Sequence, residues 1–384
     1  MNNLEIGRLK KEDCKELIEF LNHVFTIQNN SEMHFENLYP RIFRPDDKMM
    51  GCHLAAKYNG KICGVVATYP FKYHIGGSTL TAGAAGNVAV DSAYRGQGIM
   101  QKLMNQIAAE SKDAGIDFCY LHGDRWRYRN FGYERCGVEI NFHIKASMLR
   151  NHTAESRLKL TKLTQDDTAL IDSLYNYYKT QRTFEERDKE TFYLALTAKG
   201  HITYAITSEK GETIGYITVT GGDQSSIIEL SLCDTTLFAD VLKTFLESAK
   251  LEVAYLSIPA YHEAVSEAFK YADRYIVFQP GNFLILNFKS VTEAFMREKA
   301  FCDHLPDGVL SIDSEIFGKW QISKCGENIS VDPFDGNADF ILEGHSVYTF
   351  MFGTLPPFGK KGNPEKEALA KAWFPLPLYG PYLS

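Results

Sequence analysis

The stretch VAVDSAYRGQGIM, residues 88–100, decides the fold that this sequence predicts. Val88-Ala89-Val90 ends an apolar run that is typical of a strand, and the residues after Gly98 open a helix. Gly96 and Gly98 lack a Cβ atom, so the backbone N–H groups at the positive end of the helix dipole stay accessible. The stretch therefore predicts an anion site between a strand and a helix.

The side chains in the same turn indicate which kind of anion could bind there. The Arg95 guanidinium and the Gln97 amide can contact phosphate oxygens while the two glycines let a pyrophosphate approach the main chain. A glycine-rich connection with a solvated arginine is the plain alternative, because short glycine motifs often mislead. The stretch has neither GxxxxGK[ST] nor GxGxxG, which argues against a nucleotide hydrolase or a dinucleotide enzyme.

The flanking residues predict a mixed sheet. Apolar residues recur at helical spacing after Gly98, namely Ile99, Met100, Leu103, Met104 and Ile107. A short apolar run at 117–121 predicts the next strand. Upstream, we expect a strand near 4–9, a helix over 12–25, two strands joined at Asn59-Gly60, and a fourth strand over 80–90.

The rest of the chain predicts two further units, because 384 residues exceed the roughly 100–200 of one ordinary domain. Residues 151–287 repeat the order of elements seen in 1–150. Leu232-Cys-Asp-Thr-Thr236 replaces the glycine-rich turn there, so this copy is expected not to bind the cofactor. Residues 288–384 form a third unit that ends in an apolar, proline-rich tail, expected to be extended and buried. The predicted class is α/β (α+β).

The composition of the chain argues against several classes of binding partner. The formal net charge is −7 and no basic stripe stands out, so we expect no nucleic acid. The eight cysteines and eleven histidines are scattered, which predicts no metal site and a reducing, cytoplasmic setting. No secretory signal and no long apolar run occur, so no membrane association is expected.

Tyr94-Arg-Gly-Gln-Gly-Ile99 after Val88-Ala89-Val90 resembles the acetyl-CoA motif of the GNAT acetyltransferase superfamily. Arg95 and Gly98 match the pattern (Gln/Arg)-x-x-Gly-x-(Gly/Ala), and Met100 departs from it. A bulky residue there is similar to the enhanced intracellular survival (Eis) branch. That resemblance implies two tandem GNAT domains, a C-terminal domain similar to sterol carrier proteins, and acetyl-CoA bound by residues 88–90 and 95–100.

The resemblance extends to Tyr128-Arg-Asn-Phe-Gly-Tyr133, which is similar to an element after the family's fifth strand. It implies that Tyr128 is the general acid that protonates the departing thiolate. The motif singles out Tyr128 from 21 tyrosines. Val90, with Val88 alongside, matches the position whose backbone N–H binds the thioester carbonyl.

The base that deprotonates the amine stays open at this stage. The Eis-type resemblance implies the α-carboxylate of Ser384, carried into the active site by the tail. His122 and Asp124, which follow the fifth predicted strand, and a water chain are the alternatives. A tail that merely caps the third domain is equally compatible with the sequence. Cys119, on the adjacent strand, leaves open a covalent route in place of direct transfer.

The leading hypothesis is transfer of the acetyl group of acetyl-CoA to an amine in a ternary complex. Polyamines, aminoglycosides and lysine side chains are the acceptors that the net charge and the resemblance favour. A non-catalytic acyl-CoA sensor or assembly module is the alternative from another class, and transfer of a longer acyl or an aminoacyl group is a third. The branch resemblance also implies a homo-oligomer.

Overall fold

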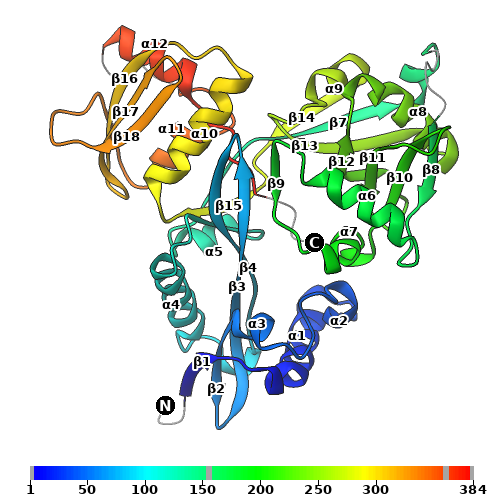
Figure 1. Ribbon diagram of the computed structural model, residues 1–384. Coiled ribbons are helices and arrows are strands. Elements are labelled where there is room, and N and C mark those ends of the chain that lie inside the picture. The colour runs from blue at the N-terminus through cyan, green and yellow to red at the C-terminus, as the bar shows by residue number, and fades with distance from the viewer. Residues whose placement is uncertain (1–3, 153–157, 358–362, 381–384) are drawn as a thin grey trace.

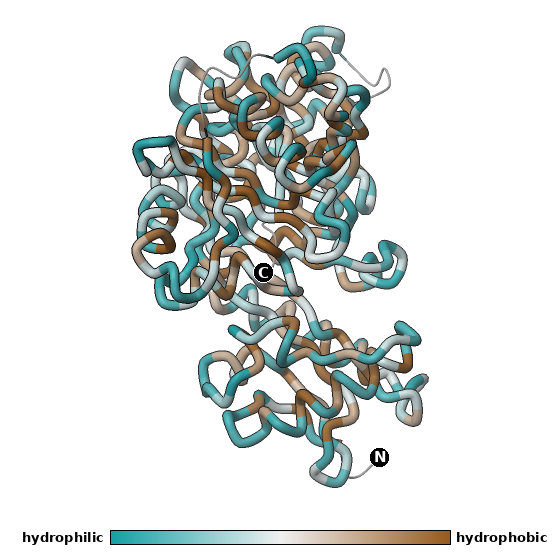
Figure 2. The backbone as a smooth tube through the Cα atoms, turned by 90° about the vertical axis from the view of Figure 1, so that its right-hand side faces the viewer, coloured by the Kyte–Doolittle hydropathy of each residue, from teal (hydrophilic) through white to brown (hydrophobic). Residues whose placement is uncertain are grey.

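The computed structural model describes residues 4–152, 158–357 and 363–380 and contains three mixed sheets (Figure 1). Each sheet has one parallel strand pair among antiparallel neighbours. Figure 2 shows hydrophobic segments running through the middle of the bodies and polar segments at their edges. The predicted mixed α/β class is confirmed.

The first sheet carries the stretch at 88–100. Its order is β1 (Leu4–Arg8), β2 (His53–Tyr58), β3 (Lys61–Ile75), β4 (Ser78–Val90), β5 (Phe118–Leu121), β15 (Gly281–Ile285) and β6 (Glu134–Cys136), and β9 (Thr183–Glu185) pairs with β3. Asn59 and Gly60 both adopt positive φ in the β2–β3 turn, as their sequence predicts. The helices are α1 (Cys14–Asn29), α2 (Phe35–Leu38), α3 (Asp47–Gly51), α4 (Ile99–Asp113) and α5 (Arg125–Arg129).

The second sheet repeats this plan. Its order is β14 (Arg274–Phe278), β7 (Glu139–Lys145), β13 (Val253–Pro259), β12 (Ser226–Leu232), β11 (Thr213–Val219), β10 (Ile202–Ser208) and β8 (Leu158–Lys162). The helices are α6 (Thr168–Tyr178), α7 (Phe192–Leu196), α8 (Phe238–Ala249) and α9 (Val265–Tyr271). In both sheets, a strand, a long helix and a strand form the central parallel unit: β4–α4–β5 and β12–α8–β13.

Two strands cross between these units. β7 comes before residue 150 yet belongs to the second sheet, and β15 comes before residue 288 yet lies between β5 and β6 of the first. The predicted segments 1–150 and 151–287 therefore do not coincide with the two sheets. Each unit completes its sheet with a strand that lies on the other side of the predicted boundary.

The third sheet has the order β18 (Asn328–Pro333), β17 (Gly318–Cys325), β16 (Gly308–Ser314) and β19 (Phe340–Leu342). It accompanies α10 (Phe288–Cys302), α11 (Ser346–Phe352) and α12 (Pro364–Trp373). One apolar core joins it to the first sheet, with Phe118 and Phe283 in the same cluster as Phe295 and Tyr348. The tail after α12 is irregular and buried, as expected, with Phe374, Leu376 and Leu378 fully buried.

Candidate active site

A bulge opens the first sheet beside β5. Val65 pairs with Ala89, but Ala67 pairs with Gly86, so two residues of β4 face one residue of β3. The parallel pairing of β4 with β5 covers only residues 82–84 of β4, while β15 pairs along the other edge of β5. The last residues of β4, Val88 to Val90 included, therefore diverge from β5. This opening leads from the sheet toward the start of α4.

The bulge is held by a hydrogen-bonded network that sequence reasoning missed. Asn87, at φ +55°, donates its amide to the Tyr69 hydroxyl (2.6 Å), which lies 2.8 Å from Nε2 of His53. Nδ1 of His53 lies 3.1 Å from the Met49 carbonyl, so it carries the ring proton and Nε2 accepts from Tyr69. Burial lowers the pKa of His53 to about 4. The sequence signal was Asn87 itself, a polar residue of low strand propensity inside an apolar strand pattern.

The turn at the start of α4 has the geometry of an anion site. Gly96 and Gly98 adopt φ +77° and +74°, and a Cβ at either position would meet nothing within 4 Å. Within the described residues, the amides of Gly96, Gln97 and Gly98 donate to no acceptor. No side chain caps the helix at Gly98. Several unpaired donors thus lie together at the start of α4, where the helix dipole favours negative charge.

The side chains around these amides divide into two groups. Arg95 and Gln97 are exposed, with Nε of Arg95 3.3 Å from the Val90 carbonyl. Ile99 is buried and packs where a Cβ on Gly64 would lie, while Met100 is partly buried against the same core. Ile99 and Met100 thus offer only their backbone to a ligand, and Arg95 and Gln97 can also offer side chains.

Tyr128 lies on α5, immediately beyond β5. Its ring is only 6% exposed and belongs to the cluster that contains Ala85 of β4 and Leu103 of α4, on either side of the opening. Gly123 makes room for it, because a Cβ there would lie 2.6 Å from the ring. Burial raises the pKa of the Tyr128 phenol, so the hydroxyl keeps its proton at neutral pH.

His122 lies at the end of β5, with Nε2 2.7 Å from the Tyr120 hydroxyl. Desolvation by the surrounding protein, together with the charges of Lys199 and Arg135, lowers the pKa of His122, which favours the neutral ring. The chain tail reaches the same place, because a Cβ on Gly380 would lie 2.4 Å from the Tyr120 ring. Ser384, the other predicted base, lies outside the described residues.

Cys119 and Asp124 have other roles than those considered for them. Burial raises the pKa of the Cys119 thiol to about 12, so the nucleophilic thiolate is scarce near neutral pH. The Asp124 carboxylate accepts a hydrogen bond from the Arg127 amide (2.7 Å) and caps α5.

The sequence model of a protein family described as "Acetyltransferase (GNAT) domain" matches residues 5–136. These residues form a GNAT acetyltransferase domain. They contain the bulge, the glycine-rich turn and Tyr128, and the fold of this domain supports acyl transfer from an acyl-CoA to an amine. No curated protein matches the chain.

Solved structures share the fold of nearly the whole chain. A GCN5-related N-acetyltransferase from Anabaena variabilis has a TM-score of 0.70 at 15% identity, covering 97% of both chains. One from Kribbella flavida has a TM-score of 0.67 at 14% identity, covering 97% of this chain and 95% of its own. Eis1 from Mycobacterium abscessus has a TM-score of 0.65 at 13% identity, covering 96% of both.

The second sheet lacks the open turn of the GNAT domain. At the start of α8, the Asp234 carboxylate accepts hydrogen bonds from the Thr236 amide (2.9 Å) and hydroxyl (2.6 Å). These bonds lower the pKa of Asp234. Asp91 caps the equivalent 3₁₀ turn in the first unit, where residues 95–98 separate that turn from α4. Here the turn capped by Asp234 runs directly into α8, so the glycine-rich segment has no counterpart.

The described residues hold neither a cluster of metal ligands nor a membrane-spanning helix. Among them, no group of three or more His, Cys, Asp or Glu side chains is arranged to hold a metal ion. No helix in the described part of the chain is both long and apolar enough to cross a membrane.

Proposed function

We propose that the chain is an acetyl-CoA-dependent N-acetyltransferase with one active site, in the GNAT domain. The observation that carries this proposal is the set of unpaired amides at Gly96, Gln97 and Gly98, next to a strand opening that ends at Tyr128. The residues fit a coenzyme A pyrophosphate, because donors without Cβ atoms surround open space. Because β4 and β5 diverge, the backbone N–H and C=O groups of residues 88–90 can bind the arm of the cofactor that carries the thioester.

The proposed reaction is direct. The amine nitrogen attacks the thioester carbonyl carbon, a C–N bond forms, and the C–S bond breaks. The backbone N–H of Val90, with Val88 alongside, stabilises the developing charge on the carbonyl oxygen. The Tyr128 hydroxyl, which burial keeps protonated, gives its proton to the departing sulfur. A base takes the proton that the amine loses.

His122 is the proposed base among the described residues. Its lowered pKa keeps an imidazole nitrogen free to accept a proton near neutral pH, and the Tyr120 hydroxyl orients the ring. The proton can reach it through one water. Lys199, from the second unit, places its Nζ 5.6 Å from the centre of the Tyr39 ring, and its charge acts on His122. We propose that Lys199 and Tyr39 form part of the wall around the bound amine.

The acceptor is proposed to be a polyamine, an aminoglycoside or a lysine side chain, in keeping with the acidic net charge. The second GNAT-like unit is proposed to bind no acetyl-CoA, since its 3₁₀ turn 235–237 runs directly into α8 without a glycine-rich segment. The third unit is the one for which the sequence resemblance implies a domain similar to sterol carrier proteins. We propose that it supports the first sheet through the apolar core that the two share. No lipid function follows from that likeness.

We also propose that the chain forms a homo-oligomer through β14. This strand is the edge of the second sheet, and four consecutive apolar residues on it, Tyr275 to Phe278, are exposed. An exposed apolar edge strand is a template for pairing with another chain. A second copy can pair with it antiparallel across a two-fold axis.

The deciding experiment measures free thiol released from acetyl-CoA in the presence of polyamines, aminoglycosides and lysine peptides. Amine-dependent release supports the enzyme. Acetyl-CoA binding without release from any amine would favour an acyl-CoA sensor. Competition between acyl-CoAs of different chain length tests transfer of a longer acyl group.

A further inference from the structure

A cavity of about 590 Å³ lies outside the proposed active site, where the second sheet, α10 and the tail meet. Its walls come from the diverging ends of β12 and β13, the loop into α9, the segment around β9, and Tyr379. β12 and β13 pair only at Ser226–Ile227, as β4 and β5 pair only briefly. The cavity therefore occupies the strand opening that corresponds to the one in the GNAT domain.

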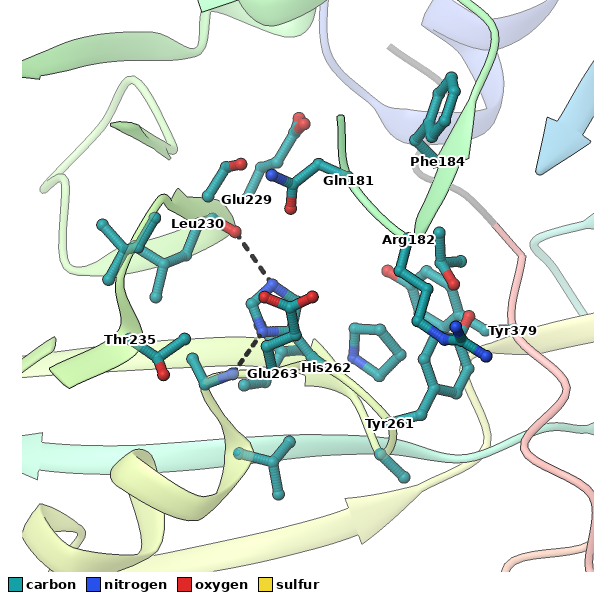
Figure 3. A pocket seen from close by; sticks show the side chains of 18 of the residues that line it. Gln181, Arg182, Phe184, Glu229, Leu230, Thr235, Tyr261, His262, Glu263 and Tyr379 are labelled. Carbon is teal, nitrogen blue, oxygen red and sulfur yellow. Dashed lines mark hydrogen bonds between the residues drawn. The ribbon is translucent and has the colours of Figure 1, made fainter. Parts of the chain in front are cut away.

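His262 occupies this opening (Figure 3). Its Nε2 lies 3.0 Å from the Leu230 carbonyl of β12, and its Nδ1 accepts from the Ala264 amide at 3.1 Å. The ring is therefore neutral, with its proton on Nε2, and burial lowers its pKa. His262 therefore connects the end of β12 to the loop after β13. In the GNAT domain, the corresponding space is proposed to hold the thioester arm of acetyl-CoA. The wider part of the cavity beside His262 stays open.

The cavity is acidic. Five carboxylates line it (Glu185, Glu229, Glu263, Glu298 and Asp303), against two guanidiniums (Arg182 and Arg187). Both guanidiniums are already paired: Arg187 with Glu185 and Glu229, and Arg182 with Glu298 (2.9 Å). Glu263, an exposed residue, makes no ion pair within the described chain. In Figure 3 it lies beside His262.

Aromatic and hydroxyl groups complete the walls. Tyr261 and Tyr379 meet edge to face with ring centroids 6.3 Å apart, and the Tyr261 hydroxyl is held by Tyr73 at 2.8 Å. The Ser231 hydroxyl, in a side chain only 4% exposed, makes no hydrogen bond of good geometry within the described residues, although it lies near the Tyr177 hydroxyl. A buried polar atom in this state is a position for a ligand or water.

We propose that this cavity binds an organic ammonium ion, with Glu263 as its counter-ion and the tyrosine rings packed around its apolar part. Aromatic faces and a carboxylate together select a cation with an apolar body. The volume is that of a site for a small organic molecule. An anionic ligand is disfavoured, because both guanidiniums are neutralised by carboxylates of the chain. The site does not depend on acetyl transfer by the GNAT domain.

The test is calorimetric titration of the full chain with benzyltrimethylammonium, which has no N–H and cannot be acetylated. Phenylacetate and benzyl alcohol serve as anionic and neutral comparisons. We expect the cation to bind, and Glu263→Gln to weaken its binding by about tenfold, in the range for a charge-assisted contact in a partly desolvated site. Glu267→Gln removes the same charge from α9 outside the cavity and should leave the affinity unchanged.

Three further readouts decide the assignment. Saturating acetyl-CoA should not displace the cation, and thiol release should be the same in Glu263→Gln as in the native chain. A melting temperature equal to that of the native chain shows that the variant is folded. Absence of cation binding, equal binding by Glu263→Gln, or tighter binding of phenylacetate or benzyl alcohol would overturn the proposal. The cation titrations give the same answer whether or not the native chain transfers acetyl groups, so failure of this proposal is distinguishable from failure of the proposed enzyme.

Discussion

Gly98 and Gly115 stand at opposite ends of α4 with nearly the same backbone conformation, φ +74° and +73°, and a Cβ on either would meet nothing within 4 Å. Alanine at either position therefore has the same backbone cost, about 1 kcal/mol. Only Gly98 lies among the unpaired amides. The two glycines thus separate the cost of folding from the cost of ligand approach.

Gly98→Ala should weaken acetyl-CoA binding at least about tenfold, because the added methyl group holds a pyrophosphate away from the amides. Gly115→Ala should lower the stability equally and leave the affinity as in the native chain. Calorimetric titration and thermal melting of both variants measure the two effects. Equal acetyl-CoA affinity in the two variants would mean that the turn around Gly98 does not bind the cofactor.

Tyr128→Phe should lower kcat by about a hundredfold or more, in the range for loss of a general acid, with little change in acetyl-CoA affinity. Tyr133→Phe is the matched control, because Tyr133 lies in the same aromatic pair with ring centroids 6.3 Å apart. Steady-state thiol release compares the two. A fully active Tyr128→Phe enzyme would rule out the phenol as proton donor.

Asp234→Ala should lower the melting temperature, because the 3₁₀ turn 235–237 that leads into α8 loses its capping carboxylate. Acetyl-CoA affinity, stoichiometry and turnover should not change, since the active site belongs to the first sheet. Titration of the native chain should give one acetyl-CoA per chain. A second equivalent, or weaker acetyl-CoA binding in the variant, would contradict the assignment of one site.

His53 should make the protein less stable in mild acid. Its pKa is about 4 in the folded chain and about 6.5 when unfolded, so only the unfolded state takes up the proton between these values. The free energy of unfolding should therefore fall by roughly 3 kcal/mol in total as the pH drops from 6.5 to 4.

Urea unfolding at a series of pH values measures this effect. His53→Gln should be less stable at pH 7 and should lose that part of the pH dependence. His23→Gln, on the exposed face of α1, is the control and should follow the native curve. An unchanged slope in His53→Gln would mean that other groups cause the acid sensitivity.

Ile276→Lys on β14 should reduce the mass of the assembly in sedimentation experiments, because a charge on an exposed edge strand opposes pairing. Ile27→Lys, an equally exposed apolar position on α1, should not. If the native chain sediments as a monomer, the proposed oligomer is wrong.

Local patterns in the sequence predicted the elements that depend on neighbouring residues. The apolar spacing after Gly98 predicted α4, Asn59-Gly60 predicted the β2–β3 turn, and the two glycines predicted the turn at the start of α4. The pairing of β15 with β5 could not be predicted, because its partners are about 160 residues apart and each run alone fits either sheet.

The site was predicted only where its residues form a continuous motif. The His53–Tyr69–Asn87 network draws one residue from each of three strands, so no spacing reveals it. The ammonium cavity likewise gathers segments from β9, β13 and the tail. Sequence periodicity reports which face of an element is buried but not which distant side chains share that space.

The most direct test of the central claim is the rate of thiol release from acetyl-CoA by the native chain and by Gly98→Ala, measured over the amine panel. We expect amine-dependent release by the native chain, with a large loss in Gly98→Ala and none in Gly115→Ala. Tight acetyl-CoA binding with no release for any amine, or equal release by all three proteins, would contradict it.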